Sequence, residues 1–313
     1  VAFVYVRSAA YDAEDDKNTA EDYAANKRLS PMSVAGAFNS WKAGQHKMKQ
    51  EPLGVFHVEI PVTLGADRAP YKLVATDSAG KAVWFSDPLS RRFGFDANGR
   101  YALIQGGKDA ASGKAVGHLE WIRSVKATKL GNARPIYLYL PPGHDQDKTR
   151  RYPVLYMHDG ANLFDSAMIN ANGSWEVDAT ADAEIAAGRA RPFMVVGVPN
   201  TQDRMDEYTH VQDTFTSGGK KITTGGKGDK YLDFIVKELK PSIDARYRTL
   251  TTKANTAILG SSLGGLVSYQ AGLLHPTVFK YVGGMSSTFG WGQFGQNNPT
   301  MKSLYAAVTN LKG

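Results

Sequence analysis

A short glycine-flanked turn constrains this chain more than any other stretch. Residues 256–259 form an apolar run typical of a buried strand, and Gly260, Ser262 and Gly264 follow it in the pattern G-x-S-x-G. Serine is a weak nucleophile unless a base takes its proton and backbone amides stabilise the developing oxyanion. A strained turn between a strand and a helix exposes the hydroxyl for this purpose. The pattern predicts Ser262 as a nucleophile; the alternative is an ordinary glycine-rich turn in a chain with 32 glycines.

Length and composition set broad bounds. With 313 residues, 42% hydrophobic and 21% charged, the chain suits one large or two moderate globular domains. The net charge of +7 comes from lysines and arginines that form no run longer than a pair, so we expect no nucleic-acid partner. The absence of cysteine excludes disulfides, thiolate catalysis and cysteine-bound metal. No apolar run approaches the roughly 20 residues of a membrane helix, so we expect no membrane partner.

The beginning of the chain bears on localisation. Residues 1–6 form a strand-like apolar segment that lacks the charged and apolar regions of a signal peptide. We therefore expect that any signal peptide has been removed or never existed. We expect a secreted or periplasmic bacterial protein.

Residues 1–107 are predicted to form a β-rich module. Short β-prone runs follow one another with little helical periodicity between them. These runs are residues 1–7, 33–36, 55–60, 71–75 and 81–85, and an acidic insertion at residues 11–28 is either a loop or a short helix. Asp77 to Gly80 has turn chemistry, so the last two runs are predicted to form a hairpin. Regularly spaced strands without helices predict a β-sandwich.

Several motifs in this module have a counterpart in a known kind of domain. They are Gly36-Ala37-Phe38-Asn39-Ser40-Trp41, Gly54-Val55-Phe56, Tyr71-Lys72-Leu73 and Asp87-Pro88. Together they resemble the early-set, immunoglobulin-like modules called CBM48, found before glycogen-active and xylan-active enzymes. An exposed tryptophan can stack on a sugar ring, so Trp41 and Asn39 are the candidate carbohydrate-binding residues. The alternative is that Trp41 and Trp84 are core or interface residues, because a fold alone does not establish a site.

Residues 118–313 show the alternation of strands and helices that the serine turn requires, after a predicted linker at residues 108–117. Continuous apolar runs indicate strands covered on both faces. These runs lie at residues 154–157, 193–198, 256–259 and 281–285. Before them, residues 118–129 and 133–140 are predicted to form an antiparallel pair. The fold class is therefore α/β with a mostly parallel sheet, and Ser262 lies at the carboxyl end of a strand.

Two helices are predicted in this half. Residues 231–239 follow helical spacing, and the helix should stop near Pro241 because proline lacks an amide donor. A second helix follows Ser262 and should end at His275.

Three further motifs strengthen the interpretation of the serine turn. They are Tyr156-Met157-His158-Asp159-Gly160-Ala161-Asn162-Leu163-Phe164, Trp175-Glu176-Val177-Asp178 and Asp203-Arg204-Met205-Asp206-Glu207-Tyr208-Thr209. With the turn, they resemble the esterase D branch of the α/β-hydrolases, which is similar to carbohydrate esterase family 1 and to enterochelin esterases. The resemblance covers about residues 118–291. It implies Ser262 as the catalytic nucleophile, the amide of Leu263 as one oxyanion donor and an amide at Gly160 or Ala161 as the second. No metal or organic cofactor is implied.

Other polar residues of this half have structural interpretations. His158 follows a buried strand, so we expect a structural hydrogen bond and no role as a base. Arg204 and Glu207 are expected to form an ion pair with each other. His46, His57, His118 and His144 have no spacing that suggests a metal site.

The acid and the base of a catalytic triad are missing from the sequence. An α/β-hydrolase supplies them after its serine, yet no Asp or Glu follows Ser262, and His275 is too close. We therefore expect the natural protein to be longer and the domain at residues 118–313 to be incomplete at its C-terminus.

The leading interpretation is a serine esterase that hydrolyses acyl or feruloyl esters on polysaccharide or oligosaccharide through an acyl-enzyme. An enzyme of another specificity, a siderophore or small-ester hydrolase, is one alternative. A non-catalytic carbohydrate-binding protein with a relic serine turn is the other. No motif in the sequence identifies the acyl group, the sugar or the oligomeric state.

Overall fold

A computed structural model describes residues 2–6, 32–50, 55–62, 68–76, 79–87, 90, 93–96, 99–105, 115–164 and 174–292. Contacts divide the chain into two compact units. One consists of Val1–Ser124, Tyr137–Lys148 and Asn162–Arg191, and the other of Val125–Ile136, Thr149–Ala161 and Pro192–Gly313. The predicted insertion at residues 11–28 and most of the predicted linker lie outside the described residues. The predicted domain boundaries stay a prediction.

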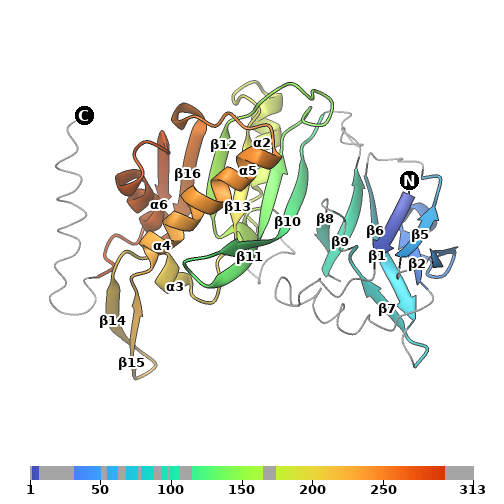
Figure 1. Cartoon of the computed structure of the whole chain (residues 1–313), viewed down its shortest axis with the longest axis horizontal. Coiled ribbons are helices and arrows are strands. Elements are labelled where there is room, and N and C mark those ends of the chain that lie inside the picture. The colour runs from blue at the N-terminus through green and yellow to red at the C-terminus, as the bar shows by residue number, and fades with distance from the viewer. Residues whose placement is uncertain are drawn as a thin grey trace. The chain divides into compact units, whose positions relative to one another are not determined.

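The first unit contains two antiparallel sheets (Figure 1). The smaller sheet has the strand order β1-β5-β4, with β1 at Ala2–Val6, β4 at Lys49–Gln50 and β5 at Val55–Glu59. The larger has the order β3-β2-β6-β9-β8, and β7 also pairs with β6. Its strands are β2 (Met32–Gly36), β3 (His46–Lys47), β6 (Arg68–Thr76), β7 (Ala82–Phe85), β8 (Phe93–Asp96) and β9 (Gly99–Gln105).

Side chains from both sheets meet in one apolar core. Phe3 and Phe56 from the smaller sheet join Val34 and Leu73 from the larger, and all four are almost fully buried. The predicted strands of this module are confirmed, and β6 and β7 pair antiparallel as the predicted hairpin. The immunoglobulin-like and CBM48 assignments stay predictions.

A six-stranded sheet in the order β10-β11-β13-β12-β16-β17 forms the centre of the α/β part. Its strands are β10 (His118–Ala127), β11 (Asn132–Leu140), β12 (Val154–His158), β13 (Met194–Val198), β16 (Thr256–Ser261) and β17 (Tyr281–Met285). Strand β12 pairs in parallel with β13 and β16, and β16 pairs in parallel with β17. The short turn between β10 and β11 permits only antiparallel pairing. This mostly parallel sheet confirms the predicted α/β class.

The connections contain the helices and one hairpin. The helices are η1 (Ala37–Asn39), η3 (Gly160–Asn162), α2 (Val177–Ala186), α3 (Arg204–Glu207), α4 (Gly228–Asp233), η5 (Phe234–Leu239), α5 (Lys240–Arg246), η6 (Lys253–Asn255) and α6 (Leu263–Leu274). Strands β14 (Gln212–Ser217) and β15 (Lys220–Gly225) form an antiparallel hairpin that projects from its unit (Figure 1). Helix α6 packs on β16 and β17 and ends at His275, as predicted. Among the described helices, none has the length and apolar character needed to cross a membrane.

The prediction that a helix stops near Pro241 is wrong. Helix α4, the π-helix η5 and α5 follow one another without a break, and Pro241 lies at the start of α5 (Figure 1). A proline ring clashes with the carbonyl four residues earlier in a regular α-helix. The six π-helical residues before α5 widen the turn, which gives the ring room and lets the helix continue.

The parallel register brings two connections to the same edge of the sheet. Met157 on β12 is paired with Leu259 on β16, so both strands end at that edge. The residues after His158 and the turn at Ser262 therefore leave the sheet side by side, where open α/β sheets place their sites.

Candidate functional site

Ser262 occupies a strained turn between β16 and α6. Its φ is 56° and its ψ is −122°, a conformation that L-residues rarely adopt. The Ser262 amide donates to the Met285 carbonyl at 2.9 Å, and its carbonyl accepts from the Thr288 amide at 3.1 Å. The Ser262 and Thr288 hydroxyl oxygens lie 3.0 Å apart. The strand, turn and helix required by the G-x-S-x-G pattern are therefore present. Hydrogen bonds from the amide and to the carbonyl of Ser262 hold the residue in its strained conformation.

The two glycines of the pattern differ in how much room the surrounding atoms leave for a side chain. A Cβ on Gly260 would lie 2.5 Å from the carbonyl carbon and oxygen of Gly264. A Cβ on Gly264 would lie 3.2 Å from the His158 Cβ, a tight contact with a side chain. The backbones of strand β16 and helix α6 are therefore in contact at Gly260. This contact explains why the position holds a glycine.

The connection after β12 brings further backbone amides to this edge. Asp159 has a φ of 54°, and the 3-10 turn η3 begins at Gly160. A left-handed residue followed by a right-handed turn directs successive N–H groups toward one point, where they can bind an anion. The Asp159 amide donates to the Tyr208 hydroxyl at 3.0 Å. The next two amides belong to Gly160 and Ala161, the predicted oxyanion donors.

Leu263, the other predicted oxyanion donor, is the first residue of α6. The first amides of a helix have no carbonyl partner within the helix, and the helix dipole favours negative charge there. Because β12 and β16 are neighbours, the start of α6 and the start of η3 lie at the same edge of the sheet. The donor roles of Leu263, Gly160 and Ala161 stay predictions.

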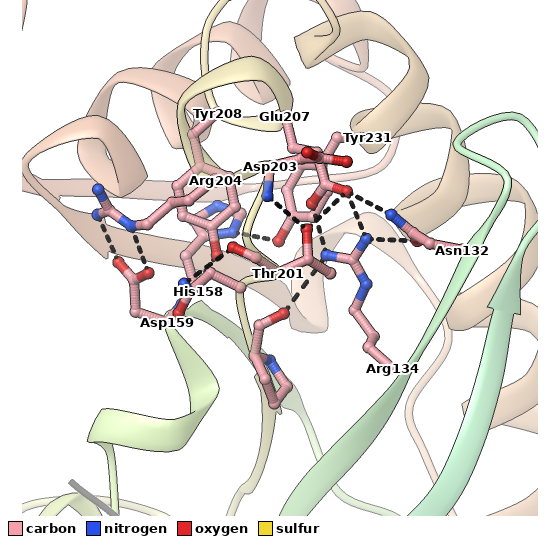
Figure 2. A network of polar contacts seen from close by, with 12 residues as sticks. Asn132, Arg134, His158, Asp159, Thr201, Asp203, Arg204, Glu207, Tyr208 and Tyr231 are labelled. Carbon is pink, nitrogen blue, oxygen red and sulfur yellow. Dashed lines mark hydrogen bonds and ion pairs between the residues drawn. The ribbon is translucent and has the colours of Figure 1, made fainter. Parts of the chain in front are cut away.

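The expected ion pair between Arg204 and Glu207 is wrong, because each residue pairs with a different partner (Figure 2). Arg204 donates from Nε and Nη2 to the two carboxylate oxygens of Asp159 at 2.7 and 2.8 Å. Glu207 accepts from Nη1 and Nη2 of Arg134 at 2.7 and 2.8 Å. Helix α3 is a single turn, so its two charged ends point to separate parts of the fold.

The Arg134–Glu207 pair is almost fully buried, with side chains 2% and 1% exposed. Glu207 also accepts from Asn132 Nδ2 at 2.8 Å and Thr201 Oγ1 at 3.2 Å. The Arg134 guanidinium lies 5.2 Å over the Phe234 ring. A buried ion pair is tolerated when hydrogen bonds satisfy its atoms, and here they reach both Nη atoms of Arg134 and both carboxylate oxygens of Glu207. The pair fixes α3 to strand β11.

His158 lies beneath the serine turn. Its Nδ1 is 2.8 Å from the Tyr231 hydroxyl. Its side chain also lies 2.8 Å from where a Cβ on Gly260 would be and 3.2 Å from where a Cβ on Gly264 would be. Burial, followed by the positive charge of Arg204, lowers the pKa of His158 from 6.5 to about 3. The ring is therefore neutral at physiological pH, which agrees with the structural role expected for it.

The other titratable groups leave few candidates for a catalytic base. His275 lies 13 residues after Ser262, across the whole of α6, and so about 20 Å away at 1.5 Å per residue. In the described ranges, no group of three or more His, Asp or Glu side chains could hold a metal ion.

The front module presents two tryptophans to solvent. Trp41 and Trp84 are 36% and 38% exposed, and their ring centroids are 6.5 Å apart. Asn39 is buried: its Oδ1 accepts from the Gly36 amide, and its Nδ2 donates to the carbonyls of Val34 and Lys42. These bonds occupy the amide, and the predicted contacts of Asn39 and Trp41 with sugar stay predictions. Trp84, rather than Asn39, lies beside Trp41 at the surface.

Comparison with known families agrees with this geometry. The family described as "Putative esterase" matches residues 127–310. The chain belongs to this esterase family. The match includes both connections at the edge of the sheet and the turn at Ser262.

Curated relatives of this esterase-family chain are partial matches. It is 28% identical over 171 residues to the uncharacterized protein YbbA of Bacillus subtilis, which covers 53% of this chain and 61% of that protein. It is 29% identical over 163 residues to an endo-1,4-beta-xylanase/feruloyl esterase of Xylanibacter ruminicola, which covers 50% of this chain and 20% of that protein. The chain thus spans less than two thirds of the length of either relative.

Solved structures that this chain matches include two that are named as hydrolases. An IroE-like serine hydrolase of Shewanella oneidensis has a TM-score of 0.46 and 24% identity, covering 61% of this chain and 56% of that one. The enterobactin esterase of Shigella flexneri has a TM-score of 0.46 and 15% identity, covering 98% of this chain and 76% of that one.

Proposed function

We propose that this chain is the nucleophile-bearing part of a serine ester hydrolase, with Ser262 as the nucleophile. The observation that carries the proposal is the backbone of Ser262, which is held at φ 56° between a parallel strand and a helix in an esterase-family chain. Strained residues of this kind persist where the surrounding structure determines them, and they cluster at active sites. An incidental serine in a glycine-rich turn would have no reason to keep such a conformation.

The proposed reaction is acyl transfer to water. The Ser262 hydroxyl oxygen bonds to the ester carbonyl carbon, and the carbonyl electrons move onto its oxygen. The amides of Leu263 and of Gly160 or Ala161 stabilise this oxyanion, and each donor contributes on the order of 10²-fold or more in rate. The intermediate then expels the alcohol, which takes up a proton, and water hydrolyses the acyl-enzyme.

A general base must accept the seryl proton, and we assign this role to neither His158 nor His275. His158 is buried, and its pKa of about 3 makes it a poor proton acceptor. His275 is at the opposite end of α6 from Ser262.

The substrate we propose is an acyl or feruloyl ester on a polysaccharide or oligosaccharide. The named feruloyl esterase activity of one relative supports this choice. The exposed pair Trp41 and Trp84 supports it independently, because two half-exposed indole rings offer apolar faces for sugar stacking.

The nucleophile is tested with a fluorophosphonate probe on the full-length protein, followed by peptide mass spectrometry. We expect labelling at Ser262, none in Ser262→Ala, and normal labelling in Ser261→Ala, which changes the neighbouring serine. A wild-type protein that stays unlabelled at Ser262 contradicts the proposal. A panel of acetyl, feruloyl and siderophore esters then identifies the acyl group.

The glycan platform has a separate test. Retention on xylan, starch and glycogen should fall in Trp41→Ala and in Trp84→Ala. Trp175→Ala is a matched control, because Trp175 is 37% exposed and lies outside the β-rich module. Equal retention of all four proteins contradicts a binding role for the pair.

A further inference from the structure

Two side chains, one helical turn apart, hold Asp159, one by its carboxylate and the other by its backbone amide (Figure 2). Arg204 binds its carboxylate through two hydrogen bonds of 2.7 and 2.8 Å. Tyr208 accepts a hydrogen bond of 3.0 Å from its backbone amide. The Arg204 guanidinium also lies 5.0 Å over the Tyr208 ring, so the two gripping residues support each other. We call Arg204, Tyr208 and Asp159 the Asp159 clamp.

The conformation of Asp159 is the first reason that a clamp is needed. Its φ of 54° is unfavourable for any residue with a Cβ, although aspartate tolerates it better than most. Asp159 directly precedes Gly160, so its φ and ψ set the direction of the next amides. A residue that relaxed to negative φ would turn the Gly160 and Ala161 amides away from their present positions.

The charge of Asp159 is the second reason. Its side chain is 8% exposed, and Oδ2 lies 3.4 Å from the position that a Cβ of Gly264 would occupy. This carboxylate therefore sits beside the first turn of α6, close to where a negative oxyanion would develop. An unpaired carboxylate there would repel that oxyanion, whereas a bidentate arginine neutralises the carboxylate.

We propose that Arg204 is a positioning residue of the hydrolytic site. It holds Asp159 in the left-handed conformation that aims the Gly160 and Ala161 amides, and it neutralises the Asp159 carboxylate beside the oxyanion. Arg204 acts through Asp159 and touches no reacting atom in this role. The inference rests on the proposed serine hydrolase function, which it deepens.

Three variants separate this role from others in steady-state hydrolysis by the full-length protein. Arg204→Gln should lower kcat by about tenfold to hundredfold with KM within about threefold, because oxyanion contacts strengthen in the transition state. In Asp159→Gly the backbone accepts positive φ freely, and no carboxylate needs a partner. The double variant Arg204→Gln/Asp159→Gly should therefore recover to within about threefold of Asp159→Gly alone.

The opposite pattern overturns the inference. If Arg204→Gln lowers activity equally in both backgrounds, or acts mainly by raising KM, then Arg204 contacts the substrate directly. Arg189→Gln is the matched control, because Arg189 also makes a bidentate pair, with Glu184, but on an exposed surface. It should leave kcat and KM unchanged.

Hydrogen exchange keeps the clamp testable apart from hydrolysis. Amides of residues 159–162 should exchange faster in Arg204→Gln than in Arg189→Gln or in the wild-type protein, whether or not Ser262 reacts. Unchanged exchange overturns the clamp. Faster exchange in a protein whose Ser262 takes up no probe supports the clamp and contradicts only the proposed function.

Discussion

Glu207→Gln should destabilise this protein severely, although the substitution changes a single atom of the side chain. The carboxylate of Glu207 is buried and accepts four hydrogen bonds, two of them from the Arg134 guanidinium at 2.7 and 2.8 Å. A glutamine keeps the shape but removes the negative charge. It leaves the guanidinium of Arg134, 2% exposed, without a counter-charge in a site that excludes water.

The magnitude follows from this burial. Removing one partner of a buried, hydrogen-bonded ion pair costs about 3 to 5 kcal/mol. The exposed pair Arg189–Glu184 has nearly the same hydrogen-bond lengths, 2.8 and 2.7 Å, with side chains 64% and 39% exposed. An exposed pair contributes about 1 kcal/mol or less, so Glu184→Gln is the matched control.

Urea unfolding at neutral pH measures the difference, because urea leaves ionic interactions unscreened. The chain has two compact units, so hydrogen exchange in β11 and α3 should be followed in parallel to assign the transition. The free energy of unfolding of the unit that contains Glu207 should fall by about 3 kcal/mol or more. A loss below about 1 kcal/mol for Glu207→Gln, equal to that of Glu184→Gln, refutes the reasoning. The double variant Arg134→Met/Glu207→Leu should be less destabilised than Glu207→Gln alone, because no buried charge is left unpaired.

Three further predictions follow from described contacts. The pKa of His158 is lower in the folded protein than in the unfolded chain, so the unfolded chain takes up the imidazole proton at a higher pH. The free energy of unfolding should therefore fall as pH drops from 6.5 toward 3, by roughly 2 kcal/mol at pH 5. Urea unfolding should show a smaller pH dependence for His158→Gln than for the wild-type protein. Gly260→Ala should lower the thermal midpoint far more than Gly264→Ala, because only the first meets backbone at 2.5 Å; equal midpoints would contradict this. Asp206→Asn should speed hydrogen exchange across the hairpin β14–β15, because Asp206 binds the Gly225 amide at 2.7 Å and Lys227 at 2.8 Å; unchanged exchange would count against this anchor.

The sheet and the serine turn were predictable from the sequence because their signals are local. Continuous apolar runs mark the parallel strands, and Gly260 lies in the short stretch where its backbone contact with Gly264 occurs. The alternation of strands and helices then places Ser262 at the carboxyl edge of the sheet. None of these features depends on contacts between residues that are distant in the sequence.

The ion pairs were not predictable, because their partners are distant in sequence. Arg204 and Asp159 are 45 residues apart, and Arg134 and Glu207 are 73 apart. Helix α3 is a single turn, too short for any periodicity to show that Glu207 faces inward. Nearness in sequence therefore suggested a pair between Arg204 and Glu207 that the structure does not contain.

Two other features have local causes that sequence patterns do not reveal. The π-helical turn before Pro241 depends on a widening of the backbone that no residue type predicts. Asn39 was predicted as a candidate sugar contact, and its amide closes the turn that precedes Trp41. Asn39 satisfies the backbone of its own segment, whereas Pro241 depends on the widened turn before it.

The φ of 56° at Ser262 also has an evolutionary consequence. Glycine would fit this backbone better than serine does, and Ser262→Gly should raise the free energy of unfolding by about 1 kcal/mol, the relieved strain less the added chain entropy. Drift toward greater stability would therefore remove the hydroxyl. Under the proposed function, selection for the chemistry of that hydroxyl opposes this drift and keeps serine at the position.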